Sequence, residues 1–169
     1  MKDPDEPALS SDGITAEGNP QHVEAQIRAL LGRERFAVLC TQGDDQPYGS
    51  VVAFAADESL LHAVFATGRA TRKYRLLEAC DRVALVVDDR DRHPDELMSV
   101  EAVTATGRAR EMPAGGERDG WAKLLIEKHP GLAGFVTAPS TALFRVDVVR
   151  YLHVRRFQEV RQWVPTSPA

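Results

Sequence analysis

The chain has 169 residues, of which 43% are apolar, and its net charge is −4. This is the length of one domain, with enough apolar residues for a buried core. The acidic balance argues against nucleic acid as a partner, and no apolar run approaches the roughly 20 residues of a membrane span. We therefore expect neither a nucleic-acid nor a membrane partner.

The N-terminal residues 1–19 are rich in Pro, Ser, Gly and acidic residues. This composition predicts a flexible tail, followed by a single domain over residues 20–169. The tail lacks a basic region followed by an apolar one, so no signal peptide is expected. Asn19 is a candidate helix N-cap and Pro20 suits the first helical position. Apolar residues then recur at helical spacing, which predicts an amphipathic helix over residues 20–32.

The remaining elements are mostly strands. Residues 36–41 and 48–55 predict a hairpin, because "QGDDQP" between them is rich in turn-forming residues. Further strands are expected at 60–67, 81–89, 99–112, 141–154 and 157–164. Gly107 is expected to bend or bulge the third of these. Short helices are expected from Thr71 to residue 79, over the end of the basic segment and "KYRLLEA", and at about 117–129. Consecutive hairpins with few helices favour an antiparallel barrel or sandwich over a parallel doubly wound sheet.

Positive charge is concentrated where the strand at 60–67 meets the following helix. Arg72 and Lys73 lie in the first turn of that helix. The hydroxyl-bearing residues Thr67 and Thr71 come just before them in the sequence. A helix N-terminus attracts phosphate, but cations there oppose the helix dipole at a cost of a few tenths to about 1 kcal/mol unless an anion binds. We therefore interpret this junction as a site for a small anion. The alternative is a solvated basic face that pairs with Glu78, Asp81 or Asp88.

The junction also carries a family resemblance. "TGRATRK" after a strand, then a short helix and "DRVALVV", resembles the pyridoxamine 5'-phosphate oxidase-like FMN-binding split-barrel proteins. "FAVLCTQGDDQPYGSVVAF" and "VTATGRARE" are similar to the first hairpin and the long strand of that family, so the resemblance covers about residues 22–164. It implies a mainly β (α+β) fold: a six-stranded antiparallel split β-barrel of Greek-key type with flanking helices. In the family FMN lies between two protomers, so the resemblance also implies a homodimer.

The same resemblance implies site residues. Four residues fall on the positions that hold the FMN phosphate: Thr67, Thr71, Arg72 and Lys73. The second strand lacks the Arg and Lys that the pyridoxine-pathway oxidases carry there. The ring edge would instead meet the backbone and hydroxyl groups of Ser50, Val51 and Val52. Trp163 is either a core residue or a cover over a flavin at a subunit interface.

The resemblance is weaker for the reaction than for the cofactor. "YLHVRRFQEVRQW" does not match the C-terminal Arg-Leu-His-Asp-Arg motif with which the pyridoxine-pathway oxidases hold their substrate. We therefore expect a cytoplasmic FMN-dependent oxidoreductase with another small-molecule substrate, and no catalytic acid or base is apparent. Two alternatives stay open: the same barrel with F420 or haem in place of FMN, and a non-enzymatic flavin-binding module.

No chemical role is expected for the two cysteines or for two of the histidines. Cys40 and Cys80 lie in apolar runs and are expected to be buried, reduced thiols, with no metal site. His62 is expected to be a hydrogen-bonded or exposed strand residue. His129, which precedes a proline, is expected to be solvated.

Overall fold

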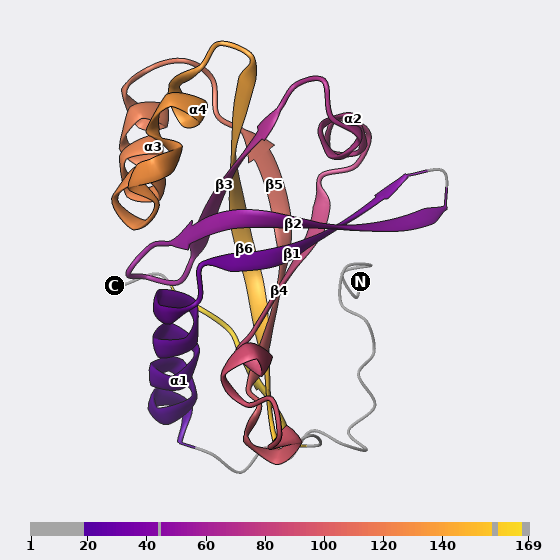
Figure 1. Cartoon of the computed structure of the whole chain (residues 1–169), viewed down its shortest axis with the longest axis vertical. Coiled ribbons are helices and arrows are strands. Elements are labelled where there is room, and N and C mark those ends of the chain that lie inside the picture. The colour runs from indigo at the N-terminus through magenta and orange to yellow at the C-terminus, as the bar shows by residue number, and fades with distance from the viewer. Residues whose placement is uncertain (1–18, 44, 157–158, 167–169) are drawn as a thin grey trace.

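A computed structural model of the chain describes residues 19–43, 45–156 and 159–166 (Figure 1). Seven antiparallel strands form one sheet in the order β3-β2-β1-β4-β5-β6-β7. Pairing of β3 with β6 closes the first six strands into a barrel, and β7 pairs with β6 outside it. The strands are β1 (Phe36–Gly43), β2 (Gln46–Ala56), β3 (His62–Gly68), β4 (Arg82–Asp88), β5 (Ala102–Glu111), β6 (Thr141–Arg155) and β7 (Glu159–Trp163). The six-stranded split barrel expected from the sequence is confirmed.

Helices flank this barrel on several sides. They are α1 (Pro20–Arg33), α2 (Arg72–Ala79), α3 (Gly116–Lys128) and α4 (Ala133–Thr137). Figure 1 shows α3 and α4 together beside one end of the barrel, with α2 across from them and α1 farther down. The short helix α4 was not predicted, because His129, Pro130 and Gly131 indicate an end to helical structure. A 3-10 turn over Pro130–Leu132 leads directly into α4, and Val136 of α4 is fully buried.

Helix α1 begins as expected. The Asn19 side chain accepts a hydrogen bond from the backbone N–H of Gln21 at 3.1 Å, and Pro20 occupies the first turn. The helix runs one residue past the expected end, because Gly32 keeps helical geometry and Glu34 is the C-cap. The tail expected over residues 1–19 lies outside the described residues apart from Asn19.

The barrel interior holds the main core. Phe65 and Phe144 stack with ring centroids 5.5 Å apart, and the hydroxyl of buried Tyr151 donates to the Leu60 carbonyl at 2.7 Å. The bulge expected in β5 is confirmed by a register shift between Thr106 and Gly107. A Cβ at Gly107 would clash with the backbone carbonyl of Asp147, so the close approach of β6 requires glycine there.

The two cysteines depart from expectation in their burial. Cys40 and Cys80 are free thiols, but both are half-buried rather than buried. Cys40 lies on β1 between the buried residues Leu39 and Thr41, whose side chains point to the opposite face of the strand. Partial burial still raises the pKa of the Cys40 thiol.

Among the described residues, no helix combines the length and the apolar character needed to cross a bilayer.

Candidate functional site

The strand-to-helix junction is built around two threonine hydroxyls. Thr71 is the N-cap of α2: its Oγ1 accepts a hydrogen bond from the Tyr74 N–H at 3.3 Å and donates to the Gly68 carbonyl at 2.8 Å. The Thr67 Oγ1 lies 3.0 Å from the Thr71 Oγ1. Because the Thr71 proton is directed to Gly68, Thr67 is the donor of this pair. The two hydroxyls therefore meet, as expected, and together they fix the start of the helix.

The cations that follow have different surroundings. Lys73 is half-buried, and its Nζ lies 3.4 Å from the Val51 carbonyl. Desolvation of this amine lowers the pKa of Lys73. Arg72 is exposed, and its guanidinium lies 4.8 Å from the centre of the Tyr48 ring, an ordinary cation–π distance.

The expected alternative, a basic face neutralised by neighbouring carboxylates, does not describe this junction. Within the described ranges neither Arg72 nor Lys73 forms an ion pair. Asp81 pairs instead with Arg108 and Asp88 with Arg90. Arg69, the cation that precedes the N-cap, is neutralised, since its guanidinium lies 2.5 Å from a Glu111 oxygen. Two cations thus stand without a counter-charge at a helix N-terminus, where the dipole disfavours them.

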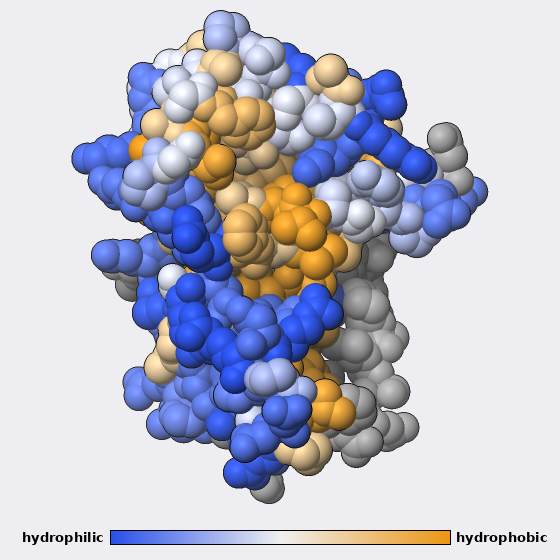
Figure 2. Space-filling view, in the orientation of Figure 1, coloured by the Kyte–Doolittle hydropathy of each residue, from blue (hydrophilic) through white to orange (hydrophobic). Residues whose placement is uncertain are grey.

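A cavity of about 590 Å³ opens beside this junction. It lies in the size range of about 300–1,000 Å³ that is usual for small-molecule sites. Five of the expected site residues line it: Val51, Val52, Thr67, Thr71 and Lys73. Figure 2 shows a hydrophobic hollow in this face of the molecule, surrounded by hydrophilic residues. One end of the cavity is therefore cationic and hydroxyl-bearing, while much of its wall is apolar.

Three expected site residues do not line the cavity. The Arg72 side chain lies over Tyr48 outside the lining, and the Ser50 Oγ is buried without a hydrogen-bond partner in the described part of the chain. Trp163 packs on Tyr151, with ring centroids 5.7 Å apart, at the edge of the main core. Contact between Trp163 and a flavin of a second copy stays a prediction.

The opposite wall of the cavity was not expected from the sequence. It consists of Arg35 and Phe36 at the start of β1 and of residues from the end of α3 through α4: Leu125, His129, Gly131, Leu132 and Phe135. The expectation that His129 is solvated is wrong, because its side chain is 2% exposed and its Nε2 lies 2.9 Å from the Phe54 carbonyl of β2. The apolar residues after "HPG" were the available signal, since a solvated loop does not need them.

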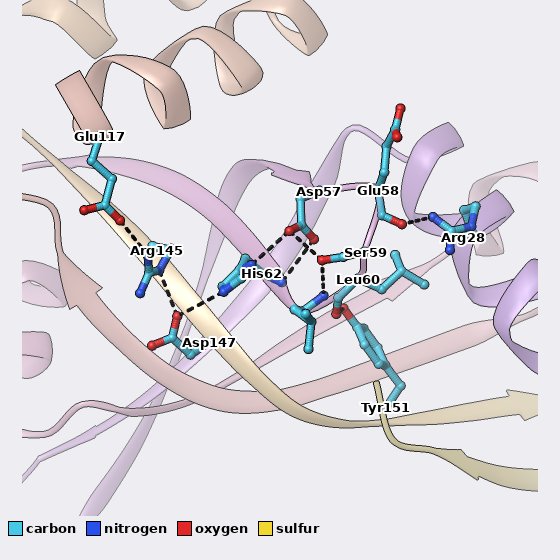
Figure 3. A network of polar contacts seen from close by, with 11 residues as sticks. Arg28, Asp57, Glu58, Ser59, Leu60, His62, Glu117, Arg145, Asp147 and Tyr151 are labelled. Carbon is cyan, nitrogen blue, oxygen red and sulfur yellow. Dashed lines mark hydrogen bonds and ion pairs between the residues drawn. The ribbon is translucent and has the colours of Figure 1, made fainter. Parts of the chain in front are cut away.

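His62 has a structural place outside this cavity. Its Nδ1 lies 2.9 Å from Asp57 Oδ2 in the turn between β2 and β3, and its Nε2 lies 3.7 Å from Asp147 Oδ1 on β6 (Figure 3). Arg145 extends the network, since it bonds both Asp147 and Glu117 of α3 at 2.8 Å. The expectation of a hydrogen-bonded strand residue is confirmed. Across the described ranges, no cluster of three or more His, Cys, Asp or Glu side chains suits a metal ion.

Known proteins share this architecture. No curated protein sequence matches the chain significantly. A heme-binding protein from Mycobacterium smegmatis superposes with a TM-score of 0.74 at 15% identity, over 84% of this chain and 57% of that longer chain. A FAD-binding protein from Mesorhizobium loti superposes with a TM-score of 0.59 at 20% identity, over 76% of this chain and 91% of that chain.

A third solved structure belongs to the pyridoxinephosphate oxidase family. It is a protein related to general stress protein 26 from Clostridium acetobutylicum, with a TM-score of 0.65 at 11% identity, over 87% of this chain and 96% of that chain. At these identities the structures show the shared fold alone. The sequence model of the pyridoxamine 5'-phosphate oxidase family, however, matches residues 23–155, which is most of the chain. The chain therefore belongs to the pyridoxamine 5'-phosphate oxidase family.

Proposed function

We propose that the chain binds FMN in the cavity between α2 and the α3–α4 region and acts as a cytoplasmic oxidoreductase on a small molecule. One observation carries this proposal: within a single cavity, an unneutralised lysine at a helix N-terminus faces walls that are largely apolar. FMN has the matching polarity, with a phosphate at one end and a flat aromatic ring at the other. The free thiols of Cys40 and Cys80 agree with a reducing compartment.

The phosphate end of the ligand would lie at the N-terminus of α2. In the described part of the chain, the backbone N–H groups of Arg72 and Lys73 donate to no backbone carbonyl, so they remain available to an anion. The Lys73 amine adds a charge-assisted contact worth about 1.5–3 kcal/mol. Thr67 and Thr71 hold these groups in place through the N-cap, and a shift of the Thr67 proton would give the phosphate a further donor.

The ring end would lie against the apolar walls. Val51 and Val52 present one edge of β2, and Leu132 and Phe135 present the facing surface. Bound FMN would supply hydride or electron transfer, which these side chains have no means to perform. The chain's own residues bind the phosphate, orient the ring and exclude water from part of its surface.

Haem and F420 are the alternative cofactors, and a non-enzymatic flavin-binding module is the alternative role. The Mycobacterium smegmatis neighbour is a heme-binding protein, which keeps haem in consideration for this barrel. FMN is the better proposal here because Lys73, Thr67 and Thr71 meet in the cavity at a helix N-terminus, where phosphate binds readily. The neighbour from Mesorhizobium loti is a FAD-binding protein, which supports a flavin over haem.

The proposal is tested by titrating the purified protein, freed of any bound cofactor, with FMN, F420 and hemin in parallel. We expect FMN to bind most tightly, with quenching of its fluorescence, and the bound flavin to be reduced by NADH or NADPH. Preferred binding of hemin or F420 would replace the FMN proposal. Tight FMN binding without reduction by any nicotinamide would favour the non-enzymatic module.

We also propose that the protein is a homodimer with the cavity at the subunit interface. Phe36, Val51 and Phe135 border the cavity and are 59%, 65% and 43% exposed, an unusual density of large apolar surface for a monomer. A second copy of the chain, as the family resemblance implies, would cover them. Light scattering should give twice the chain mass, and Val51→Asp should shift the protein toward monomer. A monomer that holds a full complement of FMN would contradict this proposal.

A further inference from the structure

The histidine in the cavity wall has an unusual environment. His129 ends α3 and is 2% exposed, and the cavity that it lines also contains Lys73 and Thr71. A buried polar side chain is normally held by hydrogen bonds on all its polar atoms, because an unmade bond in an apolar site is costly. His129 satisfies only half of this requirement within the described chain.

The satisfied half is Nε2. It lies 2.9 Å from the backbone carbonyl of Phe54 in β2. A carbonyl oxygen only accepts hydrogen bonds, so Nε2 carries the proton and donates it. In the neutral imidazole this places the lone pair on Nδ1 and leaves that atom as an acceptor.

The unsatisfied half is Nδ1. It has no hydrogen-bond partner among the described residues. It is also not fully sealed from solvent. Because so little of His129 is exposed elsewhere, we infer that the small accessible part of the ring, including Nδ1, faces the cavity. Leu125, Leu132 and Phe135 in the wall offer no donor from their side chains, and in the described chain the guanidinium of Arg35, which also lines the cavity, makes no hydrogen bond to Nδ1. A ligand in the cavity must therefore supply the missing donor or leave Nδ1 to water.

We propose that His129 recognises the ring system of the bound flavin by accepting a hydrogen bond at Nδ1 from the imide N–H of the ring. This inference rests on the proposed function, since it assumes a flavin in the cavity. The isoalloxazine ring has one imide N–H, at N3, at the end away from its dimethylbenzene edge. With the phosphate at Lys73 and the imide at His129, the ligand is held at two separate points of one cavity. His129 is thus a specificity-determining residue, and the bond to Phe54 positions it.

The experiment compares FMN with N3-methyl-FMN, which lacks the imide proton but keeps the phosphate and the ring. Wild-type protein should bind FMN about 3- to 30-fold more tightly than N3-methyl-FMN. This ratio corresponds to the loss of one hydrogen bond in a buried site. His129→Phe should lose that factor for FMN and bind N3-methyl-FMN as wild type does. His129→Gln, which keeps an acceptor, should restore part of the preference. His62→Phe replaces a histidine outside the cavity and should leave the ratio unchanged.

The outcomes separate the inference from the proposed function. Failure of wild-type protein to bind FMN would overturn both. Tight FMN binding with no preference over N3-methyl-FMN would overturn the inference alone, and this result needs no variant to fold. A preference that persists in His129→Phe would show that the methyl group clashes elsewhere, and would also overturn it. Hemin binding with a Soret shift lost in His129→Ala would assign the Nδ1 lone pair to iron instead.

Discussion

At the scale of single residues, the site depends on which cation enters the cavity. Arg72 and Lys73 are adjacent and share the first turn of α2, but only Lys73 lines the cavity, while Arg72 lies over Tyr48. The difference arises because successive residues of a helix point about 100° apart. Partial desolvation lowers the pKa of Lys73, so a bound phosphate would stabilise its protonated form.

Replacing Lys73 should therefore affect phosphorylated flavins selectively. We expect Lys73→Ala to weaken FMN about 10- to 100-fold, which corresponds to one charge-assisted contact, and to change riboflavin binding little. Arg72→Ala should have the smaller effect of the two, and Arg75→Ala, which removes an exposed cation from the same helix, should have almost none. Fluorescence titration measures all three. Equal losses for FMN and riboflavin in Lys73→Ala would show that Lys73 does not face the phosphate.

At the scale of elements, the ends of α1 and α3 are joined by one side chain. The Lys128 Nζ donates to the Leu31 carbonyl at 2.6 Å and lies 4.1 Å from the centre of the Phe54 ring. Leu31 is in the last turn of α1, whose carbonyls have no partner within the helix, so a cation there also complements the helix dipole. Burial between the two helices lowers the pKa of Lys128 to about 8, and Glu34 partly opposes this shift.

The lowered pKa predicts a pH dependence of stability. Between about pH 8 and 10.5 the unfolded chain keeps a proton that the folded chain has released, so the free energy of unfolding should rise with pH. Below pH 8 both states are protonated and this contribution is constant. We expect a relative gain of at most about 2 kcal/mol over the Lys128→Met variant, because partial exposure screens the effect. Urea unfolding of both proteins at pH 7.5 and 10 measures it. An equal change in the free energy of unfolding of both proteins between these pH values would contradict the lowered pKa of Lys128.

At the scale of the whole molecule, the C-terminal arginines lie apart from the cavity of their own chain. Arg155 ends β6 and bonds Glu101 at 3.0 Å, while Arg156, in a left-handed turn at φ 46°, bonds Glu159 at 3.1 Å. Both guanidiniums are thus already neutralised by carboxylates, and neither lines the cavity. A substrate with its own phosphate would need a second cluster of available cations.

We therefore predict that the protein does not oxidise pyridoxine 5'-phosphate or pyridoxamine 5'-phosphate at a useful rate. Loss of two charge-assisted substrate contacts would lower catalytic efficiency by about 10²–10⁴. Oxidase assays under air with FMN-saturated protein test this expectation. Turnover near 1 s⁻¹, at the lower end of ordinary enzyme rates, would show that other residues hold the substrate phosphate.

Features that depend on local chemistry were predictable from the sequence. Turn-forming residues predicted the hairpin of β1 and β2, Asn19 is the expected N-cap of α1, and Thr71 stands at the start of α2 as expected. The cluster of Thr67, Thr71 and Lys73 was predictable because its members lie within seven residues of one another. Such features depend on hydrogen bonds and dihedral angles inside one short segment.

The surroundings of that cluster were not predictable from the sequence, because long-range packing creates them. Closure of the barrel and the turn after α3 bring His129 against Phe54, 75 residues away, and bury a side chain that its own neighbours in sequence would leave in water. The same long-range packing placed Lys128 on Leu31. Burial depends on which distant segments of the chain pack together, and a local sequence pattern does not specify this packing.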